Sequence, residues 1–324
     1  MSRSECLVAP FPCMTEKEIY RDLCEKENSI PLFSQAWWMD ATCGESAWNV
    51  ILVRNSQGEV VASLPYLLKK KWGFKFICQP QLTQTNGVWF RPTPYKNDNE
   101  RLSAEKKMDD AIIQRIDSMK LLFFSQCFHH SFSNWLPFHW RGFWQTTRYT
   151  YRTSDIQDLD TVLLRFSDAK QRHIKKAMRN GLRADTMDAE AFYEFCCSAH
   201  EKRGEKNILS KELVLRCIST ATSRGNGKII AIKDKEEKIH SALFLCWDKE
   251  SAYYLIPATL PEYKTSGASS LLVWEAFQEA QRQNLQSFDF EGSMEENIEN
   301  SYRQYGAEQT PYFKISKGLL SHFL

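Results

Sequence analysis

The sequence has almost no net charge and no long apolar run. It contains 42 Lys and Arg against 40 Asp and Glu, which leaves a net charge of +2, so a protein that binds nucleic acid through its bulk charge is excluded. No apolar stretch approaches the ~20 residues that cross a bilayer. The first residues, MSRSE, also lack the apolar segment of a signal peptide. We therefore expect a cytoplasmic protein without a transmembrane segment.

Several catalytic motifs are missing as well. The sequence has no CxxC, HExxH, GxSxG, GxxxxGK[ST] or GxGxxG, which argues against a zinc centre, a serine nucleophile, a P-loop and a dinucleotide fold. Its ten cysteines are scattered, a distribution typical of packing in a reducing compartment. His129, His130 and His139 lie near Cys127 without metal-ligand spacing, so we expect no tightly bound cofactor or metal.

The chain is long and apolar enough for two domains. Its 324 residues exceed the length of one typical domain, and 43% hydrophobic residues are too many for a disordered chain. A helix, helix, strand hairpin, strand, helix and strand are predicted in this order in each half. The hairpin at 50–53 and 61–64 resembles the one at 229–232 and 240–243. This pattern favours a duplicated α/β unit, although two unrelated α/β domains would share such elements.

We place the domain boundary near residues 148–154, which gives domains at 1–150 and 151–324. An aromatic cluster precedes this boundary. Because exposed tryptophans in a linker would be costly, we expect this cluster to be buried where the halves meet. Its members are Trp135, Phe138, Trp140, Phe143 and Trp144.

Residues 165–183 are strongly basic, with seven Lys or Arg and one acid, Asp168. Asp168 as N-cap and Asn180-Gly181 as stop predict a helix between them. At 100° per residue, one face carries Ile174, Ala177, Met178 and Gly181. The opposite face carries Arg172, Lys175, Lys176, Arg179 and Arg183. Like charges at this spacing oppose folding slightly, which favours an anionic partner, while a solvated helix face is the alternative.

Small residues lead into a predicted helix at 271–283. Backbone amides at such a start can hold a phosphate of a donor, whereas ordinary capping by Thr265 or Ser266 is the alternative. The candidate phosphate-binding residues are Lys264, Ser266, Gly267, Ala268 and Ser269.

Two acids follow a predicted strand at 287–290. Strand alternation directs Asp289 and Glu291 to one side, away from Phe288 and Phe290. Paired carboxyls in a cleft can have one raised pKa and act as a general base for an amine, or they can simply cap the next helix. Further along, Arg303 could support an oxyanion or lie at the surface.

These stretches together resemble a known family. The basic helix with Asn180-Gly181, the start at 267–269, the motif FDFEGS at 288–293 and YRQYG at 302–306 resemble the FemABX-like acyltransferases of the GNAT superfamily. The resemblance implies an α/β (α+β) fold of two tandem GNAT-like domains. Each has a mixed, mostly antiparallel sheet flanked by helices, and the N-terminal copy is degenerate.

The resemblance also implies a bacterial enzyme that forms an amide bond without a covalent intermediate. The donor would be aminoacyl-tRNA or acyl-CoA, and the acceptor a nucleotide- or lipid-linked amine of a cell-envelope or polysaccharide precursor. The catalytic residues would be Asp289, Glu291 and Arg303, with Arg303 where relatives have Lys. The substrate-binding residues would be Arg172, Lys176, Arg179, Tyr254, Tyr302 and Tyr305.

Two alternatives stay open. One is an acetyl-CoA-dependent N-acetyltransferase of a small amine, although residues 264–270 lack the spaced glycines of a typical CoA pyrophosphate loop. The other is a non-catalytic tandem-GNAT module that binds an anionic ligand. No long heptad segment is present, so the inserted coiled coil of some relatives is missing, which weakens the expectation of extensive tRNA contacts.

Overall fold

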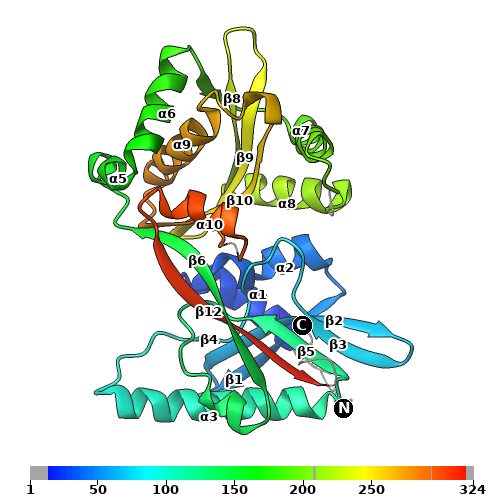
Figure 1. The fold of residues 1–324 in the computed structure, drawn as a ribbon. Coiled ribbons are helices and arrows are strands. Elements are labelled where there is room, and N and C mark those ends of the chain that lie inside the picture. Colours follow the sequence, from blue (N-terminus) through cyan, green and yellow to red (C-terminus); the bar gives the residue numbers. More distant parts are fainter. Residues whose placement is uncertain (1–13, 207–208, 293, 319–324) are drawn as a thin grey trace, which may run out of the picture.

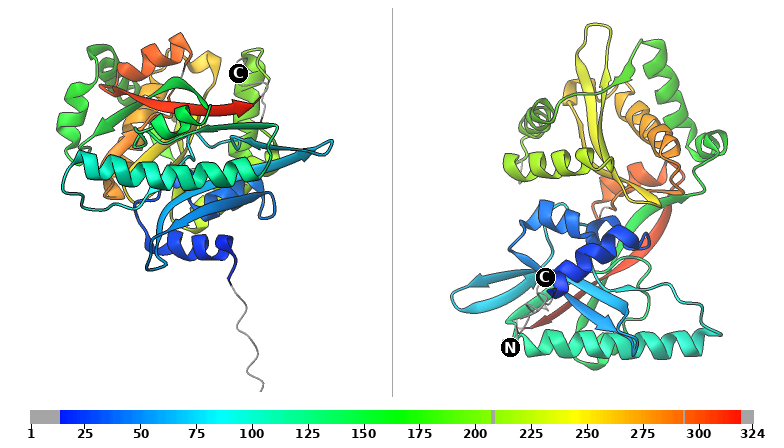
Figure 2. Two further views of the ribbon diagram at one scale, coloured as in Figure 1. Left: turned by 90° about the horizontal axis from the view of Figure 1, so that it is seen from below. Right: turned by 180° about the vertical axis from the view of Figure 1, so that it is seen from behind.

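The computed structural model describes residues 14–206, 209–292 and 294–318. Ser293 of the FDFEGS motif therefore lies outside the described residues. Figure 1 shows two lobes, one from each half of the chain, joined by the twisted ribbon of two long strands. Figure 2 gives the same arrangement from below and from behind.

The helices and strands follow each other in a similar order in both halves. The first half contains α1 (Glu16–Lys26), the 3-10 helix η1 (Leu32–Ser34), α2 (Ala36–Cys43), β1 (Trp48–Arg54), β2 (Val60–Lys71), β3 (Phe74–Cys78), β4 (Trp89–Phe90), α3 (Asp98–Ser118), β5 (Phe123–Cys127), α4 (Leu136–Trp140) and β6 (Trp144–Ser154). The second half contains α5 (Leu159–Arg165), α6 (Asp168–Arg179), β7 (Arg183–Asp185), α7 (Ala189–Lys202), α8 (Lys211–Ser223), β8 (Gly227–Lys233), β9 (Ile239–Trp247), β10 (Ser251–Thr259), the 3-10 helix η2 (Pro261–Tyr263), α9 (Ala268–Arg282), β11 (Ser287–Asp289), α10 (Glu296–Arg303) and β12 (Glu308–Gly318).

Across the described residues, twelve strands form one sheet in the order β1-β2-β3-β5-β12-β6-β11-β10-β9-β8-β7, with β4 on β2. In the first half, β1, β2 and β3 are antiparallel and β5 is parallel to β3. In the second half, β8, β9 and β10 are antiparallel and β11 is parallel to β10. The shared topology confirms the tandem, mostly antiparallel α/β architecture expected from the sequence.

The final strand of each half crosses to the other half. β12 pairs with β5 and β6 pairs with β11, and β6 and β12 also pair with each other. Residue 150 lies inside β6, so the hydrogen-bonded sheet runs without a break across the proposed boundary. The division into 1–150 and 151–324 therefore stays a prediction.

Helices cover the sheet with apolar faces. In the first half, α3 places Ile112 and Ile116 against Phe124 of β5. In the second half, α6 and α9 lie together on one face of the sheet (Figure 1), where Ala177 and Phe277 belong to one buried cluster. At the junction of the halves, α2 packs against α8. The Arg216 Nε donates to the Ala41 carbonyl there at 2.6 Å.

The aromatic cluster before β6 does not lie at the junction, so that expectation is wrong. Phe138 and Phe143 are buried, but they pack with the first half's own core. Trp140 and Trp144 are 58% and 52% exposed. The short helix α4 explains the difference, because its spacing turns Phe138 inward and leaves the Trp140 ring under the Lys106 ammonium at 4.9 Å.

Candidate functional site

A pocket of about 190 Å³ opens between the two halves. The first half contributes the segment after α1 and the loop after β5, including Ser29 and His129. Strand β6 contributes Arg152, and the second half contributes Asp248 of the turn between β9 and β10 and Tyr253 of β10. Because loops from both halves meet here, the pocket exists only when the chain is fully folded.

Asp289 lies beside this pocket at the end of β11. Phe288 and Phe290 point into the core of the second half, as strand alternation predicts. Asp289 points to the opposite side of the sheet, where it is 4% exposed. The neighbouring strands pair Tyr253 and Arg152 with Asp289 in register, so the two pocket residues and the carboxyl come together through the sheet.

The Asp289 carboxylate is held by β6 and by its own loop. Its Oδ1 accepts a hydrogen bond from the Thr150 hydroxyl and another from the Glu291 amide at 2.8 Å. The Nε of Arg152 lies 3.6 Å from Oδ2. Thr150 and Arg152 are two residues apart on one strand, so they share a face and reach the same carboxylate.

Glu291 leaves the strand in an unusual conformation. Its φ is +64°, a left-handed value that is rare outside glycine and often found at functional sites. Its Oε1 is buried and has no hydrogen-bond partner in the part of the chain described. Burial, aided by the Asp289 charge, raises the pKa of Glu291 well above its ordinary value.

The pKa of Asp289 is also raised, to about 6, chiefly by burial. The Thr150 and Glu291 hydrogen bonds and the nearby Arg152 charge limit the rise, because each favours the ionised form. At neutral pH such a carboxyl is mostly ionised and still takes up a proton readily. This is the property that a general base for an amine requires.

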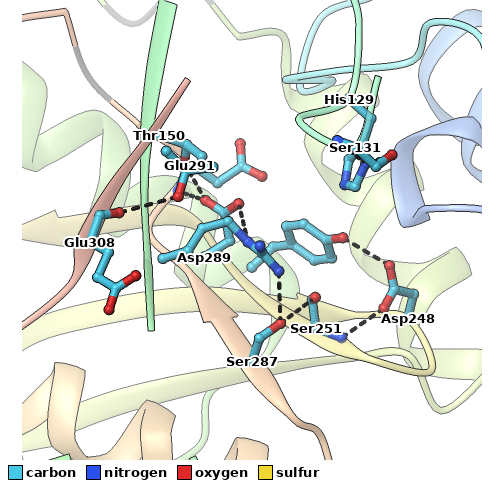
Figure 3. A network of polar contacts seen from close by, with 12 residues as sticks. His129, Ser131, Thr150, Asp248, Ser251, Ser287, Asp289, Glu291 and Glu308 are labelled. Carbon is cyan, nitrogen blue, oxygen red and sulfur yellow. Dashed lines mark hydrogen bonds and ion pairs between the residues drawn. The ribbon is translucent and has the colours of Figure 1, made fainter. Parts of the chain in front are cut away.

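A chain of polar contacts leads from Asp289 into the pocket (Figure 3). Arg152 Nη2 donates to the Ser287 hydroxyl at 3.1 Å, and the hydroxyls of Ser287 and Ser251 are 2.6 Å apart. The Ser251 amide then donates to Asp248 Oδ1 at 2.8 Å. This series of hydrogen bonds holds the Arg152 guanidinium beside Asp289.

Asp248 also ties the two halves together. Its Oδ2 accepts from the Tyr253 hydroxyl at 2.8 Å and from the Leu32 amide of the first half at 3.0 Å. The Phe33 and Tyr253 rings lie 4.9 Å apart in the same region. The pocket wall is therefore built by direct contacts between the halves.

His129 and His130 also line the pocket, and Figure 3 shows His129 on the loop after β5, across from Asp248. Burial, the neighbouring His130 and Arg152 lower the pKa of His129 well below its usual range. Burial and Arg152 lower the pKa of His130 to about 4. Both imidazoles are therefore neutral at physiological pH, so they offer hydrogen bonds to a ligand without adding positive charge.

The three predicted substrate-binding tyrosines meet on the other side of β11. The rings of Tyr254, Tyr302 and Tyr305 lie 5.7, 4.9 and 5.6 Å from the Phe290 ring. Tyr254 and Tyr305 are buried, and Lys170 lies 4.4 Å over the Tyr305 ring. The three tyrosines line the core side of the strand rather than the pocket. Their contact with substrate stays a prediction.

The basic helix is α6, and its cationic face is exposed as predicted. Ser167 rather than Asp168 is its N-cap, and Met178 is 48% exposed instead of packed, so these two details were wrong. The Lys176 ammonium donates to the Thr265 carbonyl at 2.7 Å. Arg172 and Arg179 border a shallow hollow on α6 itself, away from the pocket between the halves.

The small-residue loop at the start of α9 packs against α6. Gly267 has a φ of +87°, and a Cβ there would lie 2.4 Å from a backbone carbonyl oxygen of α6, so only glycine fits. The Ser266 hydroxyl accepts from the Ala268 amide at 3.2 Å. The N-cap of α9 is Gly267, but the Ser266 contact still occupies one of the amides proposed for a phosphate, while the exposed Lys264 lies beside the helix start. Donor binding by this loop stays a prediction.

Arg303 ends α10 with its side chain 61% exposed. Its Nε lies 3.5 Å from the Glu299 carboxylate, and Nη2 donates to Asn300 at 3.0 Å. The contacts found for it within the described chain are thus with its own helix, not with Asp289 or Glu291.

Sequence reasoning missed Thr150, Arg152, Asp248 and Ser287. The first two lie on β6, whose residues had been interpreted as a domain boundary. The alternation of Thr and Tyr through 147–153 is typical of a strand and was the available signal. Asp248 and Ser287 carry no local signal, since their contacts are made across the sheet.

The structure gives little support for a metal site or a cysteine nucleophile. Within the described ranges, no group of three or more His, Cys, Asp or Glu could hold a metal ion. The described cysteines form no disulfide with one another, and burial raises the pKa of Cys196 and Cys217 to about 12, which disfavours a thiolate nucleophile at these two positions. No helix in the described part of the chain is both long and apolar enough to cross a membrane.

The duplicated, mostly antiparallel sheet with its flanking helices has the tandem GNAT architecture that the sequence resemblance implied. Residues 148–304 match the acetyltransferase (GNAT) domain family. FemX has the same fold, with a TM-score of 0.70 at 12% identity over 93% of this chain and 96% of that chain. These two findings confirm the resemblance to the FemABX-like acyltransferases.

Two further solved structures share the fold. One is the C-terminal domain of a protein from Agrobacterium fabrum described as a lysylphosphatidylglycerol synthetase, with a TM-score of 0.56 at 10% identity over 94% of this chain and 92% of that chain. The other is L-PGS from Bacillus licheniformis, with a TM-score of 0.53 at 10% identity over 93% and 90%. No curated protein sequence matches the chain significantly.

Proposed function

We propose that this protein transfers an acyl or aminoacyl group to an amine and forms an amide bond, with Asp289 as general base. The observation that carries the proposal is the buried Asp289 carboxyl, whose pKa of about 6 suits proton removal from an amine at neutral pH. It lies beside a pocket that both halves build. The GNAT domain match supports acyl transfer as the reaction class.

The reaction would proceed by direct attack. The amine nitrogen of the acceptor adds to the carbonyl carbon of the donor, and its proton passes to Asp289. The oxyanion then collapses, the bond to the donor carrier breaks, and the leaving group takes up a proton. Glu291, kept protonated by its raised pKa, can donate a hydrogen bond to the developing charge. No enzyme nucleophile is required.

The sheet opens where the donor would bind. β10 and β11 pair only from Ser251 to Tyr253, with Asp289 opposite Tyr253. β10 continues to Thr259, so beyond Tyr253 its backbone has no partner strand on this side within the described chain. An extended donor can pair with such an edge, which would bring its carbonyl close to Asp289.

The donor is proposed to be acyl-CoA or aminoacyl-tRNA, whose phosphates would be bound by Lys264 and by the backbone amides at the start of α9. The acceptor is proposed to be a nucleotide- or lipid-linked amine of an envelope or polysaccharide precursor, with its anionic part on Arg172, Lys176 and Arg179. The names of the similar structures, FemX and a lysylphosphatidylglycerol synthetase, support this choice of substrates.

A smaller acceptor is the second candidate. The pocket of about 190 Å³ is below the ~300–1,000 Å³ typical of ligand sites, and the matched domain family is named for acetyl transfer. Both observations favour an acetyl-CoA-dependent N-acetyltransferase of a small amine.

The test incubates the protein with acetyl-CoA, longer acyl-CoA or charged tRNA and a panel of free, UDP-linked and lipid-linked amines, and detects amides by mass spectrometry. Asp289→Asn should lower the rate by about 10²–10⁴-fold, the usual contribution of general base catalysis. The exposed Asp160→Asn serves as the matched control. If no amide forms in any combination, and phosphate-dependent ligand binding is lost in Arg172→Ala, the chain is a non-catalytic binding module.

A further inference from the structure

The β2–β3 hairpin projects from the first lobe as a narrow arm (Figures 1 and 2). β3 pairs with β5 only at Phe76 and Ile77, so the tip from Lys69 to Lys75 extends beyond the sheet. All seven residues of this tip are exposed. Their sequence is KKKWGFK, with four lysines and no acid.

The turn at the apex contains an unexpected residue. Trp72 and Gly73 connect the pair Lys71 and Phe74, and their φ values are +51° and +78°. Positive φ at both central positions is the type I′ hairpin turn, which strongly prefers Asn-Gly. A bulky side chain in the left-handed region costs free energy. Folding alone would therefore not favour Trp72.

Burial of the Trp72 side chain does not compensate for this unfavourable free energy either. Trp72 is 83% exposed and Phe74 is 52% exposed. The described contact of the Trp72 ring is with Lys71, whose ammonium lies 4.4 Å from it. Two large apolar side chains at the end of an arm are costly in water, which indicates that they are buried against something else.

The lysines also work against folding. Lys70 and Lys75 stand directly opposite each other across the hairpin, and like charges in this position are destabilising. Among the described residues, no ion pair within 4.0 Å involves the four lysines of the tip, although the Lys75 ammonium reaches the Met119 carbonyl at 3.5 Å. The unneutralised positive charge indicates an anionic partner.

The order of the residues along the arm distinguishes between anionic partners. The tryptophan occupies the apex, and the lysine pair follows two residues behind on each strand, about 3.4 Å per residue further back. A bilayer surface meets an approaching arm first with phosphates and then with apolar chains. Tryptophan favours this boundary and lysine side chains reach back to the phosphates. An RNA duplex presents phosphates at its surface and is bound chiefly through cations, so it would leave the apical tryptophan without an apolar environment.

We propose that the β2–β3 hairpin tip is a membrane-docking element that binds the surface of an anionic bilayer. Trp72 and Phe74 enter the boundary between headgroups and acyl chains, and the four lysines bind lipid phosphates. The arm attaches the protein at the surface without spanning it. This inference does not depend on the proposed catalytic activity.

The experiment measures co-sedimentation with vesicles of phosphatidylcholine alone and of phosphatidylcholine mixed with phosphatidylglycerol, at low and high salt. The wild-type chain should bind the mixed vesicles, and high salt should weaken the binding. Lys70→Ala with Lys75→Ala should lower the partition coefficient on the order of 30-fold, since each lysine near such a surface contributes about 1 kcal/mol.

Trp72→Asn is the decisive variant, because it creates the preferred Asn-Gly turn. It should lower vesicle binding about tenfold or more while the melting temperature stays the same or rises. Trp140→Asn is the matched control, since Trp140 is another exposed tryptophan beside a lysine, and it should bind like the wild type.

Four results would overturn the proposal. The first is wild-type protein that does not bind anionic vesicles, and the second is a Trp72→Asn variant that binds them as tightly as wild type. The third is a lowered melting temperature of Trp72→Asn, which would assign the tryptophan to folding. The fourth is hairpin-dependent binding of bulk tRNA without vesicle binding, which would identify an RNA-binding arm.

Discussion

Thr150→Val removes the hydroxyl that donates to the Asp289 carboxylate with little change in shape. In the wild-type protein the pKa of Asp289 is about 6 against an ordinary 3.8, which corresponds to about 3 kcal/mol. The Thr150 hydrogen bond opposes this rise. A hydrogen bond to a charged group is worth about 1.5–3 kcal/mol, so its loss should raise the pKa of Asp289 by about one to two further units.

The stability of the protein should report this change without any substrate. The folded state keeps the Asp289 proton up to about pH 6, whereas the unfolded chain releases it near 3.8. This contribution to stability is therefore fully present below the unfolded pKa and is lost as the pH rises through the folded pKa. In Thr150→Val the loss should continue to higher pH, so the free energy of unfolding should fall furthest below wild type near pH 8.

The assay is urea unfolding of both proteins from pH 4 to pH 9. The matched control is Thr153→Val on the same strand, since the Thr153 hydroxyl is buried without a partner in the described chain. Its difference from wild type should not depend on pH. If the Thr150→Val difference were equally flat, the hydroxyl would not stabilise the ionised carboxylate, and the argument for Asp289 as a tuned base would fail.

Three other predictions concern a buried carboxyl, a crowded glycine and an exposed arginine. Asp109 is fully buried with both carboxylate oxygens unpartnered among the described residues, and burial raises its pKa, so Asp109→Leu should stabilise the fold by about 1–3 kcal/mol at pH 7. The gain should shrink toward pH 4, and the ion-paired Asp110→Leu should show no such gain in urea unfolding. Gly267→Ala should lower the free energy of unfolding by about 2 kcal/mol or more, because the added Cβ would lie 2.4 Å from a backbone oxygen. Gly225→Ala should lower it by only about 1 kcal/mol, since no atom lies within 4 Å of a Cβ there. Equal melting temperatures of the two variants would contradict this prediction. Arg172→Ala should weaken inorganic phosphate binding mainly at low salt, and unchanged titration calorimetry would contradict an anion site on α6.

Secondary structure was predictable where a local pattern was sufficient. The predicted hairpin strands at 50–53, 61–64, 229–232 and 240–243 lie within β1, β2, β8 and β9, because their β-branched and apolar runs end at turn residues or charges. β6 was missed although its pattern is strand-like, since it lies where a linker was expected. The aromatic cluster was misplaced for a similar reason, because composition alone does not say which side of a short helix faces the core.

Only part of the candidate site could be predicted from the sequence. Asp289 could be singled out because a strand ending in acids before a glycine is a local signal. Its partner Thr150 is 139 positions away in the chain, and Asp248 binds the amide of Leu32, 216 positions away. No local pattern indicates such contacts, which depend on how the final strands of the two halves are exchanged.

The sequence by itself determined the α/β class, the internal repeat, the exposed basic face of α6 and the alternation that separates Asp289 from its phenylalanine neighbours. These follow from periodicities of two and 3.6 residues, which neighbouring residues set among themselves. Tertiary structure alone decided the protonation of Asp289, the contacts of Arg152 and the pocket between the halves. Burial and charge at those positions are produced by strands that the chain brings together from opposite ends, so they have no local counterpart in the sequence.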